Sequence, residues 1–155
     1  MAQVTLRTRW DYLRKITDKM RTAFTSLNTM LTELYADSVV TFPVGLHASK
    51  TVYNVFVAKR GYTITSISYV PDIAAGTALT ATVVKASGTA TPAAGTTPMH
   101  TAGGVNLNAT AHTVQTITLG TAANLVLASG DRIGLVLSGA MSTGSGLLVV
   151  RMTRT

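Results

Sequence analysis

Apolar and polar residues follow two different periods along the chain, and the change falls near residue 37. From Thr8 to Tyr35 the sequence contains neither Gly nor Pro, and its apolar residues recur with a seven-residue repeat. From Val39 onward, short β-branched and aromatic runs are separated by Gly, Pro, Asn and Asp. The first pattern is typical of a helix and the second of strands. We therefore expect an N-terminal helix over residues 1–37, serving oligomerisation or attachment, and a β domain over residues 38–155.

The helical segment carries a broad apolar stripe. Positions a and d of the repeat are apolar over about three heptads, in the residues Leu13, Ile16, Met20, Ala23, Leu27, Met30 and Leu34. Position e widens this stripe with Trp10, Phe24 and Leu31 beside Thr17. A stripe of this width favours three or more helices, or docking on another surface, over a two-stranded coiled coil.

Two interpretations of the stripe stay open. The helix lies on its own β domain, or it joins copies of the chain into a short bundle. For the bundle, we expect the oligomer interface to consist of Leu13, Ile16, Met20, Leu27, Met30 and Leu34.

Three arginines form a second stripe, because Arg7, Arg14 and Arg21 also recur every seven residues. Asp11 and Asp18 interrupt this basic stripe, which is too sparse for the basic region of a DNA-binding zipper. We expect the three arginines to stay exposed and to be a candidate contact with an acidic protein surface. The alternative is that they only solvate the helix.

The C-terminal region contains eight strand-like runs: VVTFPVGL, TVYNVFVA, YTITSISYV, TALTATVVKA, TVQTITL, NLVLA, RIGLVLSG and GLLVVRMTRT. YTITSISYV alternates with a one-residue phase shift, which is typical of a β-bulge. Ser129, Gly130 and Asp131 predict a tight turn. The fold we expect is mainly β: an antiparallel sandwich of about eight strands, jelly-roll-like, preceded by one long amphipathic helix.

The connection between the fourth and fifth runs, residues 87–112, is long and uncharged. It consists largely of Ala, Gly, Thr, Ser and Asn, and no charged residue occurs between Lys85 and Asp131. Small side chains allow such a segment to pack closely, whereas a disordered linker of this length usually carries charge. We interpret it as a packed crossover or a subunit contact, with a mobile surface loop as the alternative.

Composition limits the classes of function. Charged residues make up 12% of the 155 residues, against about 25% in an ordinary soluble domain, which indicates a surface that faces other protein. The net charge of +7 is spread along the chain rather than clustered, so no specific nucleic acid is expected as a partner. Without Cys, neither disulfides nor thiolate metal sites can form. No run is long and apolar enough for a membrane span or a signal peptide, so neither membrane insertion nor Sec-type secretion is expected.

Few residues carry catalytic chemistry. The three histidines, His47, His100 and His112, have no metal-ligand spacing, and the two acids of the β region, Asp72 and Asp131, follow Pro or Gly as turn residues do. Nucleophile-elbow, phosphate-loop and HExxH motifs do not occur. We therefore expect no catalytic, cofactor-binding or metal-binding residue, no cofactor, and no enzymatic activity.

The stretch VFVAKRGYTITSISYVPDIAAGTALTATVVKASG, followed by HTVQTITLGTAANLVLASGDRIGLVLSG and GLLVVRMT, resembles the small β-sandwich proteins of tailed-bacteriophage virions. It is most similar to head decoration or cementing proteins and head fibres. The resemblance covers about two thirds of the chain, from Val52 to Thr153. It implies homo-oligomers, favouring trimers, that bind the major capsid protein on the capsid exterior, and synthesis in the host cytoplasm. It implies no catalytic residue.

Two other classes of function remain open. A phage fibre or a receptor- or carbohydrate-binding module is also a trimeric sandwich, but its binding face usually carries aromatic residues, which are only 6% here. A glycan-cleaving enzyme requires a converging pair of carboxylates, for which the β region offers only Asp72 and Asp131.

Overall fold

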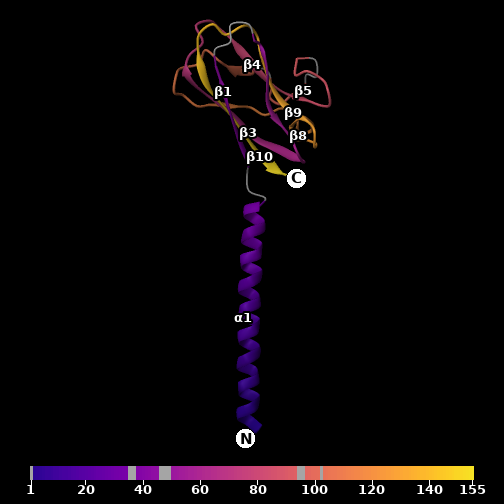
Figure 1. Ribbon diagram of the computed structural model, residues 1–155. Coiled ribbons are helices and arrows are strands. Elements are labelled where there is room, and N and C mark those ends of the chain that lie inside the picture. Colours follow the sequence, from indigo (N-terminus) through magenta and orange to yellow (C-terminus); the bar gives the residue numbers. More distant parts are fainter. Residues whose placement is uncertain (1, 35–37, 46–49, 94–96, 102) are drawn as a thin grey trace. The chain divides into compact units, whose positions relative to one another are not determined.

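The chain forms two compact units, Met1–Ala36 and Asp37–Thr155 (Figure 1). The computed structural model describes residues 2–34, 38–45, 50–93, 97–101 and 103–155, with the backbone alone for 2–6 and 32–34. The first unit is a helix, and the second contains the strands of two sheets.

The helix α1 spans Ala2–Leu34, within the segment of residues 1–37 that the sequence predicts to be helical. Its 33 residues extend over about 50 Å at the usual rise of about 1.5 Å per residue. Threonine hydroxyls on its surface donate to the carbonyl four residues earlier, at 2.9–3.0 Å, in Thr17, Thr22, Thr25 and Thr29. These hydroxyls are therefore satisfied within the helix itself.

The second unit is an antiparallel sandwich, which confirms the predicted fold class. Sheet one has the order β1 (Ser38–Val44), β10 (Ser145–Arg154), β3 (Tyr62–Ile73) and β7 (Gln115–Ile117), with β8 (Val126–Leu127) also paired to β3. Sheet two has the order β2 (Val52–Val57), β9 (Arg132–Leu137), β4 (Thr80–Ala86) and β5 (Thr97–Pro98), with β6 (Val105–Asn106) also paired to β4. A short helix, α2 (Ala122–Leu125), precedes β8.

The chain passes repeatedly between the two sheets. β1, β3 and β10 belong to sheet one, whereas β2, β4 and β9 belong to sheet two. β5 and β6 pair with different parts of β4, and β7 and β8 with different parts of β3, so each of these pairs fills one strand position. Each sheet then has four positions, the arrangement of a jelly roll.

Local details of the sequence prediction are partly confirmed. Arg151 pairs with Ser66 and Met152 with Ile64, so Thr65 is the extra residue of a bulge in β3, as the phase shift predicts. The predicted turn is present as well: Gly130 has φ 92°, and the backbone N–H of Ala128 donates to the Asp131 carboxylate at 2.9 Å.

Two details of the prediction are wrong. Asp72 is not a turn residue, because β3 continues through it to Ile73 with Pro71 paired opposite Gly146. In the run NLVLA, the first two residues belong to α2 and only Val126–Leu127 form a strand. The described residues contain ten strands, which agrees with the predicted sandwich of about eight; the two additional short strands lie within the predicted connection.

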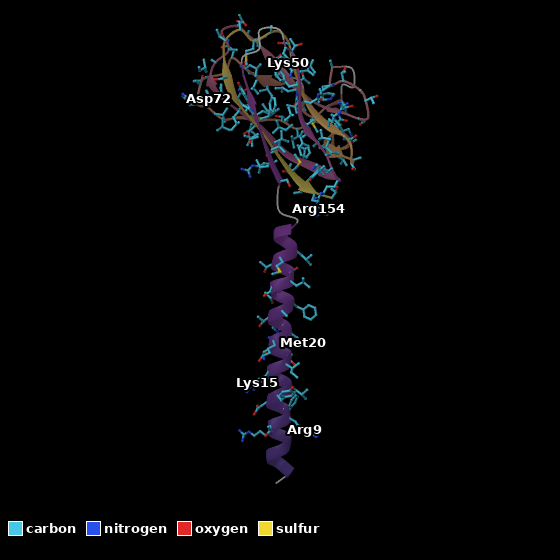
Figure 2. All side chains as sticks on the ribbon, in the orientation of Figure 1. Arg9, Lys15, Met20, Lys50, Asp72 and Arg154 are labelled. Carbon is cyan, nitrogen blue, oxygen red and sulfur yellow. The ribbon has the colours of Figure 1, made fainter. Side chains whose placement is uncertain are left out.

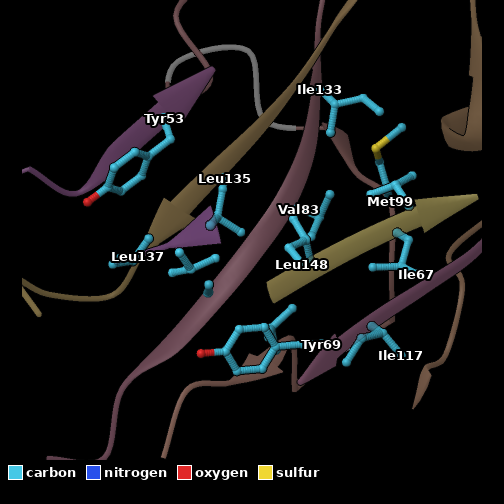
Figure 3. Packing of buried hydrophobic residues seen from close by; sticks show 14 of the residues in the cluster. Tyr53, Ile67, Tyr69, Val83, Met99, Ile117, Ile133, Leu135, Leu137 and Leu148 are labelled. Carbon is cyan, nitrogen blue, oxygen red and sulfur yellow. The ribbon is translucent and has the colours of Figure 1, made fainter. Parts of the chain in front are cut away.

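The core lies between the two sheets (Figure 3). Sheet one contributes Ile67, Tyr69 and Leu148, and sheet two contributes Val83 and Leu135, all fully buried. Burial, and secondarily the charge of Asp72, raises the pKa of the Tyr69 phenol. No side chain is possible at Gly146, where a Cβ would meet the Tyr69 ring at 2.6 Å. Sheet one thus closes tightly over this tyrosine.

The connection over residues 87–112 is a packed crossover in its described part. β5 and β6 both pair with β4 of sheet two, and between them Thr101 N–H donates at 3.0 Å to the carbonyl of Thr118, the residue that follows β7 of sheet one. Met99, Val105 and Leu107 from this segment are buried in the core at 0–1% exposure. This result supports the packed interpretation over a mobile loop, because the segment spans both sheets and supplies core side chains.

The same connection also covers part of the outer face of sheet two. The guanidinium of Arg132, on β9, donates to the carbonyls of Gly88 and Ala90, and Pro92 packs directly over Gly134. Val84 pairs with Gly134 and is fully buried, although it lies outside the core cluster between the sheets. Residues 88–92 therefore cover this face around Gly134 and Arg132.

Candidate interaction surfaces

The apolar stripe of α1 is exposed along the described length of the helix (Figure 2). Exposure is 54% for Leu13, 38% for Ile16, 54% for Met20, 51% for Leu27 and 66% for Met30. The Leu34 side chain lies outside the described residues. Considered by itself, the helix therefore presents a continuous strip of large apolar side chains.

The e positions broaden this strip as the sequence predicts. Trp10 is 73% exposed, Phe24 66% and Leu31 43%. Monomeric soluble proteins rarely leave a large contiguous apolar patch in water, so this strip is a candidate interaction surface. Its width is more than a two-stranded seam requires.

The charges of α1 are concentrated in its N-terminal part. Arg7, Arg14 and Arg21 are exposed at seven-residue intervals, whereas residues 22–31 contain no charged side chain. Asp11 and Asp18 reduce the positive charge of the N-terminal part without cancelling it. The helix thus presents a basic stripe near one end and an apolar strip along its whole described length.

In the sandwich, His100 is a buried polar side chain beside an open hollow. It is 7% exposed, and its Nδ1 donates to the Thr101 carbonyl at 2.6 Å. Nε2 is buried and has no hydrogen-bond partner among the described residues. An open hollow of about 440 Å³ lies next to the ring, between β4 and the crossover, and Thr80, Thr82 and Thr101 line it.

The hollow has no catalytic arrangement. Its lining includes hydroxyls, glycines and one proline, but no carboxylate and no lysine or arginine. Asp131 uses its carboxylate to hold the turn before β9, and Asp72 is exposed near the end of β3. No group of three or more His, Asp or Glu side chains able to hold a metal ion occurs among the described residues, and His47 lies outside them.

None of the described helices is both long enough and apolar enough to span a membrane.

Comparison with known proteins yields structural likeness alone. No protein-family model and no curated protein matches the sequence. The acid-stable capsid structure of Helicobacter pylori bacteriophage KHP30 is similar over 76% of this chain and 87% of its own, with 12% identity and a TM-score of 0.49. The capsid asymmetric unit of cyanophage Pam1 is similar over 77% and 84%, with 12% identity and a TM-score of 0.41.

A Bacillus endospore appendage from a family of disulfide-linked pili is similar over 77% of this chain and 88% of its own, with 18% identity and a TM-score of 0.31. Likenesses with TM-scores below 0.5 assign neither a family nor a function to this chain.

Proposed function

We propose that this chain is a structural virion protein of a bacteriophage that decorates or cements the outer capsid surface as a homo-oligomer, most favourably a trimer. The observation that carries this proposal is the exposed apolar strip of α1, from Leu13 to Leu31. A free chain would hold these side chains in water, and association of copies buries them.

The rest of the molecule agrees with a structural role. The described residues of the sandwich serve mainly to pack its two sheets. The crossover supplies side chains to the core and covers part of sheet two. Among the described residues, the two acids of the sandwich do not form part of a metal-binding group. The sequence texture from Val52 to Thr153 resembles head decoration proteins and head fibres. We infer that the chain is not an enzyme.

Attachment to the shell is assigned to the N-terminal part of α1 in this proposal. Arg7, Arg14 and Arg21 point along one exposed face, offset from the apolar strip that oligomerisation buries. A basic stripe fits an acidic surface of the major capsid protein, and charge complementarity mainly accelerates and orients docking. The protein then resides on the virion exterior after synthesis in the host cytoplasm.

A receptor- or carbohydrate-binding module of a fibre is the second candidate. The hydroxyl-lined hollow beside His100 favours it, because hydroxyls can hydrogen-bond a sugar. No Trp, Tyr or Phe among the described residues lines this hollow to stack on a sugar ring. Decoration therefore remains the better-supported proposal.

The copy number of the protein in purified virions separates these functions. A decoration protein is present in a fixed ratio to the major capsid protein, so quantitative mass spectrometry of virions should find many copies per particle. A handful of copies per particle would contradict decoration and favour a fibre or tail component. Absence from virions that contain the major capsid protein would contradict both.

A further inference from the structure

The two sheets of the sandwich differ in how their outer faces are covered. Part of the outer face of sheet two is covered by the chain's own residues 88–92, which accept from Arg132 and pack over Gly134. Among the described residues of the β domain, none gives such cover to the outward side chains of β1 and β10 on sheet one. We call these side chains the sheet-one face: Val39, Thr41, Pro43, Leu147, Val149 and Arg151.

The pairing of the strands makes the sheet-one face continuous. Pro43 lies opposite Leu147, Thr41 opposite Val149, and Val39 opposite Arg151. On the other side of β10, Leu147 pairs with Val70 of β3, Val149 with Ser68, and Arg151 with Ser66. Val39 is 48% exposed and Leu147 38%. Apolar and small hydroxyl side chains thus run across three neighbouring strands where a solvated sheet usually alternates polar residues outward.

The charge of this surface is low for so basic a protein. The chain carries +7, but the face contains one cation, Arg151, and the nearest acid on the same strands is Asp72 near the end of β3. A surface that meets its own copy must avoid like charge, since like charges facing each other oppose association. An acidic partner would instead require several cations, which this face lacks.

We propose that the sheet-one face binds a second copy of this chain, adding a sandwich contact to the homo-oligomer. The inference rests on the proposed homo-oligomer and extends it from α1 to the β domain. Three strands at about 4.8 Å spacing and about 17 Å of strand length give on the order of 250 Å². A stable interface buries about 800 Å² per partner, so this face supplements the helix seam.

The chain's lack of Cys allows a matched accessibility test in the full-length protein. Thr41→Cys places one thiol on the sheet-one face, and Asn54→Cys places one on the outward side of β2, the edge strand of sheet two; both positions are exposed. The rate of thiol modification is measured in concentrated and in diluted protein, with the mass of each sample determined by light scattering.

We expect the Thr41→Cys thiol to react at least about tenfold more slowly in the oligomer than after dilution to monomers, and the Asn54→Cys thiol to react equally in both. Equal rates for Thr41→Cys in a sample that is oligomeric by mass overturn the sheet-one contact and leave the homo-oligomer intact. Protection of Thr41→Cys that persists in monomers overturns it too, because the chain's own helix then covers the face. A wild-type chain that stays monomeric at every concentration contradicts the homo-oligomer and the contact together.

A pair of lysine variants tests the energetics. Leu147→Lys on the sheet-one face should weaken self-association at least about tenfold, because it sets like charges against each other across the contact. Val57→Lys, at a 54% exposed position on β2, is the control and should leave self-association unchanged. A Leu147→Lys protein that keeps the wild-type circular dichroism and the wild-type association midpoint overturns the proposal.

Discussion

The helix and the sandwich both carry large apolar residues, but the sandwich buries them within the chain whereas the helix presents them on its surface. In the sandwich, Leu135, Leu148 and Val83 are fully buried within a single chain. In α1, Leu13, Met20 and Leu27 keep about half of their surface exposed at 51–54%. The sandwich builds its core within one chain, whereas the apolar strip of the helix has no such core of its own, and we propose that other copies of the chain cover it.

The strongest test of this difference is a charge on the helix strip. Leu27→Asp removes an apolar contact worth roughly 1.5–3 kcal/mol in each chain and places a carboxylate in the seam. We expect light scattering at micromolar concentration to show loss of the oligomer. The control variant Thr25→Asp, on the opposite side of the helix, should remain oligomeric. An unchanged mass for Leu27→Asp would show that the strip is not the oligomer seam.

The converse test deletes a core side chain of the sandwich. Leu135→Ala should lower the free energy of unfolding of the β domain by about 2–5 kcal/mol, because the fully buried position lies between two packed sheets. The matched helix variant Leu13→Ala should leave the unfolding of the β domain unchanged, measured as denaturant unfolding of isolated monomers. Comparable losses in the two variants would mean that the helix packs into the sandwich core.

The basic stripe is expected to affect rate more than affinity. Replacing Arg7, Arg14 and Arg21 together with Gln should slow association with capsids stripped of this protein, by about tenfold at low salt. It should also flatten the salt dependence, since charges are screened beyond about 10 Å at 0.1 M salt. A folded triple variant that associates at the wild-type rate at low salt would leave the arginines as solvating residues of the helix.

The smallest expected effect concerns Tyr69. Its hydroxyl is buried without a hydrogen-bond partner among the described residues, so Tyr69→Phe should raise the stability of the β domain by about 1 kcal/mol. Burial raises the pKa of Tyr69, so its folded state favours the neutral phenol and loses stability as pH rises above the unfolded value of 10.0. Chemical unfolding at pH 8 and pH 11 should show a smaller alkaline loss in Tyr69→Phe. An equal loss in both proteins would contradict this assignment.

Much of the fold was predictable because the sequence periods are unambiguous. The absence of Gly and Pro from Thr8 to Tyr35 predicts α1, and the phase shift around Thr65 predicts its bulge. β5 and β6 were missed because two residues each are too few to show a period. Asp72 was misplaced because Pro71 signals a turn locally, whereas pairing with β10 carries β3 past it.

The candidate surfaces were predictable to different degrees. The helix strip follows from the heptad repeat alone. The sheet-one face does not, because the sequence cannot show which sheet the connection covers. The sequence gives only an indirect indication of the sheet-one face. In β1 and β10, the segments VVTFPV and GLLVV are largely apolar on both sides of the strand instead of alternating with polar residues. Strands that read in this way are usually buried on both faces.

The mass of the full-length chain in solution tests the central claim most directly. Sedimentation equilibrium at micromolar concentration and physiological salt reports this mass without assuming a shape. We expect three times the 16.2 kDa of the single chain, because the broad strip of α1 favours a three-helix seam. A single species of 16.2 kDa at all concentrations would contradict the proposal that copies of the chain complete the helix.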